Sequence, residues 1–314
     1  MTPFDGPFAN SYVLPLAIAA YDATIPPPGF DKTWEIVADQ AKVVASVERF
    51  SADSEDAVPS ASTSAFRAMT MQPPTLMPSA RFATSEIRAD AKTVAPNLHF
   101  GWVCADVRNG RLSVAIRGTQ FFKEWLKDFD FVAVEYEPIA DAGLVHQGFQ
   151  LVYNSIRASL QTIIAEAKVE FPQLRTFVIT GHSLGAAVVG LAAPDLIKNS
   201  IGTLDPIVYT LAEPRVGHPN YKGFYDSIVP ICYRIDNFWD IVPHFPPLLA
   251  LYEHEGEELI IDSGFSFDVA HNHELATGYV PGLAKWVQQH PTIHSEIALA
   301  EGLAAPQILV GVSP

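Results

Sequence analysis

The sequence predicts a single α/β domain in which helices flank a mixed, predominantly parallel central sheet. From residue 98 onward, short β-rich apolar runs alternate with longer segments of helical periodicity, and this alternation is typical of parallel sheets. The composition supports a large core, because 48% of the 314 residues are hydrophobic and only 18% are charged. No segment recurs at the period of a repeat protein. We therefore expect one domain over residues 1–314.

The first 97 residues carry the weakest pattern. Residues 11–23 have the spacing of an amphipathic surface helix, and residues 34–50 indicate a helix followed by a strand. Residues 51–80, rich in Ser, Ala, Pro and Met, indicate an extended surface excursion. The apolar run at 13–20 is too short to cross a bilayer, and no Lys or Arg precedes it. We therefore expect neither a transmembrane helix nor a signal peptide in this region.

The pattern sharpens after His99. Residues 100–107 and 112–116 are expected to pair as strands, because Asn109-Gly110 between them is a strong signal for a tight hairpin turn. Residues 131–136 read as a further strand. Residues 147–170 repeat apolar side chains at helical spacing and predict a long helix.

The second half of the chain continues the alternation of strands and helices. The expected strands are 176–180, 207–211 and 231–235, and 251–255 is expected to form a hairpin with 258–261. The expected helices are 186–198, 221–228 and 275–289.

The charge and cysteine content narrow the function classes. Twenty basic and 35 acidic residues give a net charge of −15, which disfavours nucleic acid and anionic membranes as partners but leaves neutral and apolar substrates open. Cys104 and Cys232 lie in apolar strand-like runs, so we expect two free buried thiols, with a single bridge between them as the alternative. No cluster of Cys and His indicates a metal site, and no cofactor is expected.

Residues 181–185, Gly-His-Ser-Leu-Gly, fit the pattern G-x-S-x-G. Their context makes the pattern specific, since they stand between a predicted strand and a predicted helix rich in small residues, as a nucleophile elbow requires. The glycines leave room for a strained turn that exposes the serine hydroxyl. The Leu184 N–H lies at the start of the helix, where the dipole favours a developing oxyanion. Ser183 is therefore the candidate nucleophile.

A serine nucleophile needs a base and a carboxylate that orients the base. In chains with this elbow, the carboxylate precedes the histidine. Asp240, in the segment after strand 231–235, is the preferred carboxylate. The alternatives are Asp205, Asp226 and Asp236.

The candidate bases downstream are His244, His254, His271 and His273. His244 is only four residues from Asp240 on the same loop, and His254 lies within the expected hairpin. His271 and His273 follow the last strand, at the start of the last helix. We prefer His273, because it directly precedes the helical run 274–279, and keep His271 as the alternative.

Several segments in order now resemble the class 3, filamentous-fungal-type lipase family. They are VAIRGTQ (114–120), the Trp-containing stretch after it, VHQGF (145–149), ITGHSLGAA (179–187), EPRVG (213–217), DIVPHFPP (240–247) and a His–Tyr segment (273–279). The resemblance covers residues 98–290, the expected catalytic core. It leaves out residues 1–97 and a tail at 291–314. It implies an α/β-hydrolase fold with a triad of Ser183, Asp240 and His273.

The resemblance also implies a second oxyanion-hole donor at Thr119, which follows a predicted strand and Gly118, beside the Leu184 donor. It further makes residues 121–129 a short helical lid. Their sequence agrees with a two-sided helix, since apolar side chains occupy one face and charged ones the other. The apolar residues of this lid are Phe121, Phe122, Trp125, Leu126 and Phe129.

The expected function is therefore a serine carboxylic-ester hydrolase, foremost a triacylglycerol lipase working through an acyl-enzyme. Its expected partners are an ester or lipid substrate and a lipid–water interface. A phospholipase, a feruloyl or aryl esterase, and a catalytically silent lipase-like binding protein are the alternatives. Among the other motif residues, we expect His146 and His182 to serve in packing, and Arg215 to hold a strand-end loop.

Overall fold

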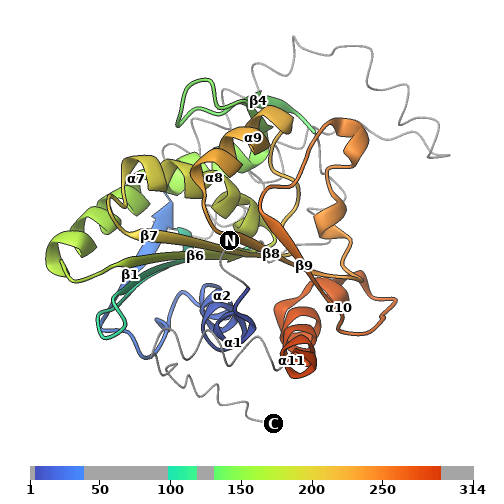
Figure 1. The fold of residues 1–314 in the computed structure, drawn as a ribbon, viewed down its shortest axis with the longest axis horizontal. Coiled ribbons are helices and arrows are strands. Elements are labelled where there is room, and N and C mark those ends of the chain that lie inside the picture. The colour runs from blue at the N-terminus through green and yellow to red at the C-terminus, as the bar shows by residue number, and fades with distance from the viewer. Residues whose placement is uncertain (1–3, 39–97, 119–130, 291–314) are drawn as a thin grey trace.

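The computed structural model describes residues 4–38, 98–118 and 131–290, and within these ranges a seven-stranded sheet forms the centre of the molecule (Figure 1). Its order is β1-β2-β3-β6-β7-β8-β9. β1 pairs with β2 and β2 with β3 antiparallel, whereas the remaining neighbours are parallel. The strands are β1 Lys32–Ala38, β2 Leu98–Asp106, β3 Arg111–Ile116, β6 Thr176–His182, β7 Asp205–Leu211, β8 Cys232–Asn237 and β9 Glu257–Ile261.

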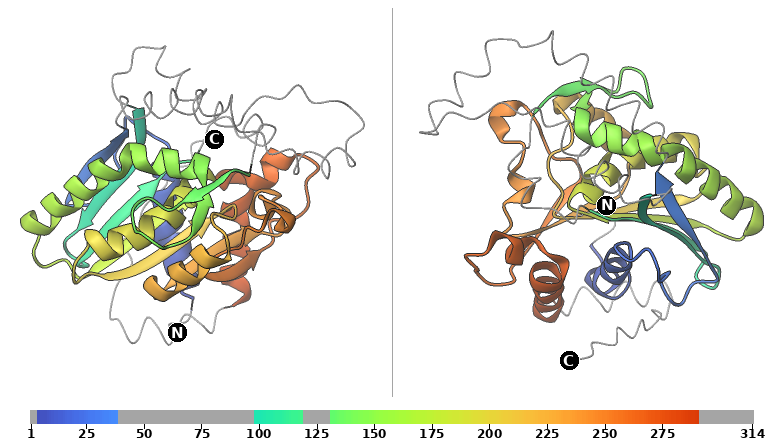
Figure 2. Two further views of the ribbon diagram at one scale, coloured as in Figure 1. Left: turned by 90° about the horizontal axis from the view of Figure 1, so that it is seen from above. Right: turned by 180° about the vertical axis from the view of Figure 1, so that it is seen from behind.

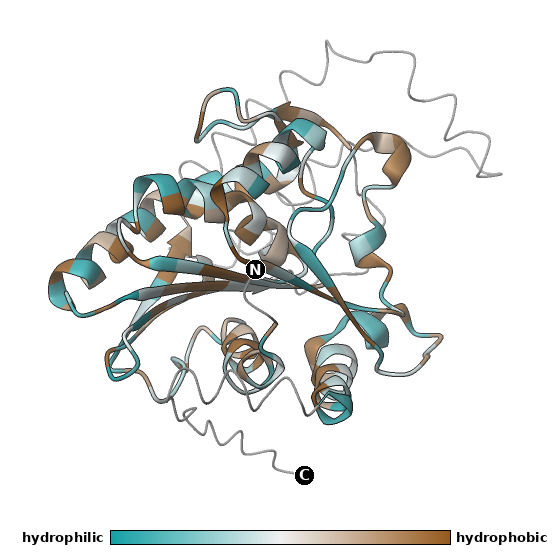
Figure 3. Ribbon diagram, viewed as in Figure 1, coloured by the Kyte–Doolittle hydropathy of each residue, from teal (hydrophilic) through white to brown (hydrophobic). Residues whose placement is uncertain are grey.

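Helices cover both faces of this sheet (Figure 2). One face carries α7 Gln147–Glu170, α8 Leu184–Asn199 and α9 Pro219–Ile228, and the opposite face carries the N-terminal helices and α11 Val280–Gln289. Each face has its own apolar cluster, and the strands between them are strongly hydrophobic (Figure 3). The predicted mixed, mostly parallel sheet between helices is thereby confirmed, because the strands are apolar on both sides.

The remaining elements are short. They are the strands β4 Ala133–Glu135 and β5 Leu144–His146, the 3₁₀ turns η2 Val242–His244 and η3 Leu248–Ala250, the helix α10 Val269–His273 and the π-helix η4 Leu275–Tyr279. β4 and β5 form a separate two-stranded sheet. The strand expected at 131–136 is thus shorter than predicted, and its partner was not predicted. The helix expected at 275–289 is a π-helix that continues into α11.

The N-terminal segment is helical, as predicted, but its place in the fold differs from the prediction. It consists of α1 Gly6–Phe8, the π-helix η1 Ala9–Val13 and α2 Leu14–Ala19. Tyr12 and Leu16 are each only 1% exposed, so this is a core helix on the sheet and not the surface helix expected at 11–23. The helix predicted at the start of 34–50 is also wrong, because β1 occupies residues 32–38.

The hairpin predicted at 251–261 is wrong. β9 is a strand, but its partner is the parallel strand β8. Residues before β9 instead turn inward, with Leu251 in the left-handed region at φ 62° and Glu253 bridged to Gly217. Among the other predictions, the span 147–170 is confirmed, and Cys104 and Cys232 are free and buried. The predictions for 51–80, 121–129 and 291–314 fall outside the described residues.

Parallel pairing brings the carboxyl ends of β3, β6, β7 and β8 to one edge of the sheet. Gly118 follows β3, Ser183 follows β6 and Asp240 follows β8. The residues predicted for chemistry therefore leave neighbouring strands at the same edge, which is where α/β sheets build their sites.

Candidate active site

Ser183 occupies a sharp turn between β6 and α8. Its backbone lies at φ 59° and ψ −125°, a strained conformation for a residue with a side chain. The turn needs glycine on both sides: a Cβ on Gly181 would lie 2.4 Å from the Gly185 carbonyl oxygen, and one on Gly185 would lie 2.2 Å from that of Ile116. The Ser183 N–H donates to the Leu211 carbonyl at 3.0 Å and fixes the turn to β7.

The backbone beside Ser183 favours a negative charge. Leu184 begins α8, and N–H groups in a first helical turn have no acceptor within the helix. They lie at the positive end of the helix dipole. Gly118, at the end of β3, faces the same turn, because a Cβ there would lie 3.1 Å from the Ser183 Cβ. Thr119 and the five lid residues predicted at 121–129 lie outside the described residues.

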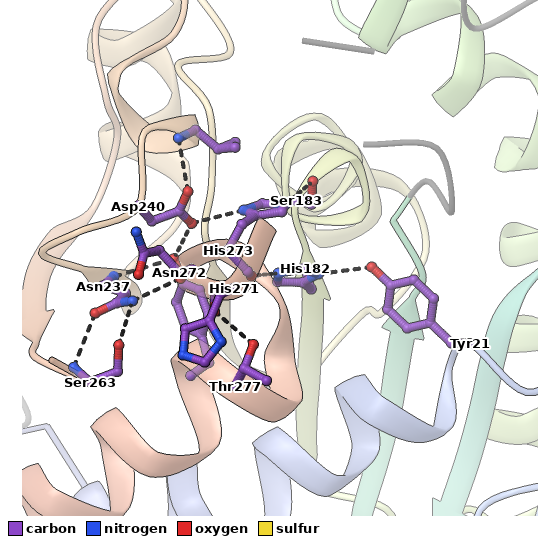
Figure 4. Close-up of polar contacts among 12 residues, drawn as sticks. Tyr21, His182, Ser183, Asn237, Asp240, Ser263, His271, Asn272, His273 and Thr277 are labelled. Carbon is purple, nitrogen blue, oxygen red and sulfur yellow. Dashed lines mark hydrogen bonds and ion pairs between the residues drawn. The ribbon is translucent and has the colours of Figure 1, made fainter. Parts of the chain in front are cut away.

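A continuous chain of hydrogen bonds joins Ser183, His273 and Asp240 (Figure 4). The Ser183 Oγ lies 2.8 Å from His273 Nε2, and His273 Nδ1 lies 2.8 Å from Asp240 Oδ2. None of the three residues is more than 2% exposed. We call this arrangement the hydrogen-bonded triad.

Two further groups donate hydrogen bonds to the Asp240 carboxylate. The Val242 N–H donates to its Oδ1 at 3.0 Å, and the Tyr279 hydroxyl donates to its Oδ2 at 2.8 Å. Burial alone would raise the pKa of Asp240, but the charge of His273 and these hydrogen bonds hold that pKa below its usual value. An ionised Asp240 accepts from His273 Nδ1–H, which leaves Nε2 free to accept the Ser183 hydroxyl proton.

His182 connects the triad to the N-terminal helix. Its Nε2 lies 2.9 Å from the His273 carbonyl oxygen and its Nδ1 lies 2.8 Å from the Tyr21 hydroxyl. Burial, followed by the proximity of His273, lowers the pKa of His182 to about 3. The neutral ring therefore donates from Nε2 to the carbonyl and accepts the Tyr21 proton at Nδ1. His182 packs behind His273, as expected for a residue that serves in packing.

Asn237, at the end of β8, fixes the helix that carries His273. Its Nδ2 donates to the Asn272 carbonyl oxygen at 2.7 Å and to Ser263 Oγ at 2.9 Å, and its N–H donates to the Tyr279 hydroxyl at 3.2 Å. Sequence reasoning missed Asn237, Tyr279 and Tyr21. Their hydrogen bonds join residues that lie 26 to 161 positions apart in the sequence, so no local sequence pattern indicates these roles.

The alternative carboxylates lie elsewhere. Asp205 is exposed at the start of β7. Asp226 pairs with Lys222 on α9, and Asp236 pairs with Arg234 at 2.9 Å.

The alternative histidines are likewise apart from Ser183. His271 and His244 are exposed, and His254 Nε2 contacts the Pro243 carbonyl oxygen at 2.7 Å. His146 caps α7 by accepting from the Phe149 N–H at 3.4 Å. Arg215 Nη1 donates to the carbonyl oxygens of His244 and Pro246, each at 2.6 Å. It therefore holds a strand-end loop, as predicted.

Part of the sequence matches a known family. Residues 113–250 match the sequence model described as Lipase (class 3). This segment of the chain is therefore similar to class 3 lipases.

Three relatives illustrate the extent of the similarity. The secreted mono- and diacylglycerol lipase 1 of Fusarium solani is 32% identical over 52% of this chain and 47% of its own length. Phospholipase A1-II 1 of Oryza sativa subsp. indica is 34% identical over 49% of this chain and 43% of its own length. The solved Rhizomucor miehei triacylglyceride lipase shares 32% identity and a TM-score of 0.48, over 52% of this chain and 61% of that one. The chain thus spans about half the length of the curated relatives it matches.

Within residues 4–38, 98–118 and 131–290, no helix is both long and apolar enough to cross a membrane. In the same ranges no group of three or more His, Cys, Asp or Glu side chains is arranged to hold a metal ion.

Proposed function

We propose that this protein hydrolyses carboxylic esters of neutral lipids, foremost triacylglycerols, through an acyl-enzyme intermediate. One observation carries the proposal: the unbroken chain of two 2.8 Å contacts from Ser183 Oγ through His273 to Asp240. This geometry provides a nucleophile, a base within reach of its proton and a carboxylate that fixes the base.

The reaction follows from these contacts. His273 Nε2 takes the hydroxyl proton as Ser183 Oγ attacks the ester carbonyl, and Asp240 stabilises the resulting imidazolium. The Leu184 N–H, together with the Thr119 N–H, would hold the oxyanion. Collapse of the tetrahedral intermediate expels the alkoxide, which takes the proton from His273. Water, activated by the same histidine, then attacks the acyl-enzyme and restores Ser183.

An aromatic ridge beside the triad supports a lipid substrate. It consists of Phe238, Trp239, Phe265 and Phe267, which are 59%, 38%, 56% and 94% exposed. Successive rings are in contact, with centroids 4.7 to 4.8 Å apart. Trp239 immediately precedes Asp240. Exposed aromatic side chains are favoured at lipid–water boundaries, and the acidity of the chain selects neutral over anionic surfaces.

A substrate panel tests this function. Purified protein is assayed on triacylglycerol emulsions, phosphatidylcholine vesicles and soluble short-chain esters, and is labelled with a fluorophosphonate probe. We expect labelling and the highest rate on the emulsion. A higher rate on phosphatidylcholine would favour the phospholipase alternative, and the highest rate on soluble aryl or feruloyl esters would favour the esterase alternative. Absence of labelling and of turnover on every ester would leave the lipase-like binding protein.

Substituting the ridge should separate surface adsorption from chemistry. In Phe267→Ser, we expect the emulsion rate to fall about threefold to tenfold, because burying a Phe side chain is worth roughly 1.5–3 kcal/mol and part of that is realised at a surface. The rate on soluble esters should stay unchanged. Val169→Ser, which alters an equally exposed apolar residue on α7 (84% exposed), should match wild type on both substrates. An equal loss on both substrates would remove the ridge from the proposal.

Tyr279 should affect the base, His273, through its hydrogen bond to Asp240. In Tyr279→Phe, Asp240 loses one hydrogen bond, so we expect its pKa to rise toward the usual value and kcat on a soluble ester to fall about tenfold, the scale of a hydrogen bond to a charged group. The acid limb of the pH profile should move to higher pH. Tyr136→Phe is the matched control, because it removes a buried hydroxyl that donates to the Leu191 carbonyl oxygen away from the triad. An unmoved acid limb would contradict this role.

A further inference from the structure

Two buried glutamates converge behind the triad. Glu213 follows β7 and Glu255 precedes β9, and both are 0% exposed. They face one point beside α8: a Cβ on Gly190 would lie 2.6 Å from Glu213 Oε1 and 3.0 Å from Glu255 Oε1. Glu213 Oε2 accepts from Thr210 Oγ1 at 2.8 Å. Within the described residues, Glu213 Oε1 and both carboxyl oxygens of Glu255 have no hydrogen-bond partner.

Two ionised carboxylates are not stable in such a place. Both would be removed from water, with Thr210 as the one side-chain donor to Glu213 and none to Glu255 among the described residues, and each would repel the other. One proton held between them removes both penalties, because the protonated carboxyl becomes a donor to its neighbour. Consistent with this, burial and then the charge of Glu255 raise the pKa of Glu213 well above its usual value, and burial raises that of Glu255 to about 7.

The surrounding charges do not replace that proton. Arg234 is the nearest cation from β8, but its guanidinium donates to Asp236 Oδ2, to the Glu255 backbone oxygen and to Glu258 Oε1, at 2.9, 2.8 and 3.1 Å. The other titratable groups near the pair come from α9 and β8. They are Tyr221, Lys222, Tyr225, Asp226, Cys232 and Asp236. His254 immediately precedes Glu255, and Glu258 of β9 pairs with Arg234.

Each glutamate adjoins a residue that holds the loop following Asp240. Two residues after Glu213, the Arg215 N–H donates to the Phe245 carbonyl oxygen at 2.7 Å, and its guanidinium holds two further carbonyl groups of the loop. Immediately before Glu255, His254 Nε2 contacts the Pro243 carbonyl oxygen at 2.7 Å. The loop is therefore anchored from both sides through the backbone that carries the pair.

We propose that Glu213 and Glu255 share one proton and act as positioning residues, which hold the loop of Asp240 in place until that proton is lost at alkaline pH. Loss of the proton to solvent leaves two facing negative charges, which push the two anchoring segments apart. The effect on turnover rests on the proposed function, whereas the shared proton and its effect on stability do not.

The sign of the pH effect follows from linkage. A carboxyl group whose pKa is higher in the folded than in the unfolded chain binds its proton preferentially in the folded state. Its contribution to stability is complete below the unfolded pKa and is lost as the pH rises through the folded pKa. The pair therefore stabilises the protein fully only below about pH 4, the ordinary range of a Glu carboxyl, and its contribution falls as the pH rises through neutral into the alkaline range.

Glu213→Gln tests the proposal, because the amide donates to Glu255 at every pH. Between about pH 5 and pH 10, we expect the Tm of wild type to fall several degrees more than that of Glu213→Gln. Between about pH 7 and pH 10, kcat on a soluble ester should fall about tenfold in wild type and less than twofold in the variant. Glu257→Gln, an identical change on exposed β9, should follow wild type. A Glu213→Gln profile parallel to wild type would overturn the proposal.

Infrared spectroscopy gives a readout that needs neither turnover nor a folded variant. Wild type at about pH 8 should show the carbonyl band of a protonated carboxylic acid, and Glu213→Gln should lack this contribution. A wild-type spectrum without such a band would overturn the shared proton whatever the variants do. If the band and the Tm profiles behave as expected while no ester is hydrolysed, the fault lies in the proposed function and not in the pair.

Discussion

Ser183→Ala is expected to abolish ester hydrolysis, with a fall in kcat on the order of 10³-fold or more. Alanine keeps the size and backbone demands of the turn but has no oxygen to attack the carbonyl. The loss should therefore appear in kcat and in fluorophosphonate labelling, while the Tm stays near that of wild type. Measurement on a soluble ester and on an emulsion should give the same fractional loss, because both substrates need the same nucleophile.

The matched control for this change is Ser155→Ala. Ser155 is also buried, at 4% exposure, but its hydroxyl donates to the Val152 carbonyl oxygen within α7. It should keep wild-type turnover and labelling. Undiminished hydrolysis by Ser183→Ala would exclude Ser183 as the nucleophile, and with it the mechanism proposed above.

Asp240→Asn is expected to lower kcat on the order of 10⁴-fold, with little change in KM. An amide at this position carries no charge to stabilise the imidazolium. It also donates to His273 Nδ1, which moves the ring proton to Nε2 and leaves no acceptor for the Ser183 hydroxyl. The pH–rate profile should show the loss over the whole accessible range.

Asp205→Asn controls for the loss of a carboxylate as such, since Asp205 is exposed at the start of β7. His271→Ala controls for the neighbouring histidine, whose ring is exposed two residues from His273. Both variants should turn over at wild-type rates. A large loss in His271→Ala with a mild loss in His273→Ala would reverse the assignment of the base.

Local chemistry explains which parts of the fold the sequence could predict. The elbow at Ser183 can be predicted from the sequence, because a strand, two glycines and a helix of small residues must be consecutive for the turn to form. The helix at 147–170 can also be predicted, because its apolar side chains recur with the period of a helix. The partner of β9 cannot be predicted in this way, since the apolar run at 259–261 indicates a strand but not its neighbour.

The parts that sequence reasoning missed depend on distant contacts. Tyr279 reaches Asp240 and Tyr21 reaches His182 across 39 and 161 positions. The spacing of residues 11–23 predicts an amphipathic surface helix. Its density of apolar residues at 12–17 instead reflects burial against the sheet, where Tyr12 contacts Ser113 Oγ at 2.7 Å.

The docking of the N-terminal helix also sets an order of events in folding. The ring centroids of Phe4 and of Trp286 in α11 lie 5.2 Å apart, and Gly6 packs against the same indole. Part of the apolar side of this helix is thus covered only by a helix near the other end of the described chain, so these contacts carry a very large sequence separation. Such contacts form late and slowly. Until α11 is synthesised, we expect the nascent chain to expose the part of the helix that faces Trp286 and to be a substrate for chaperones.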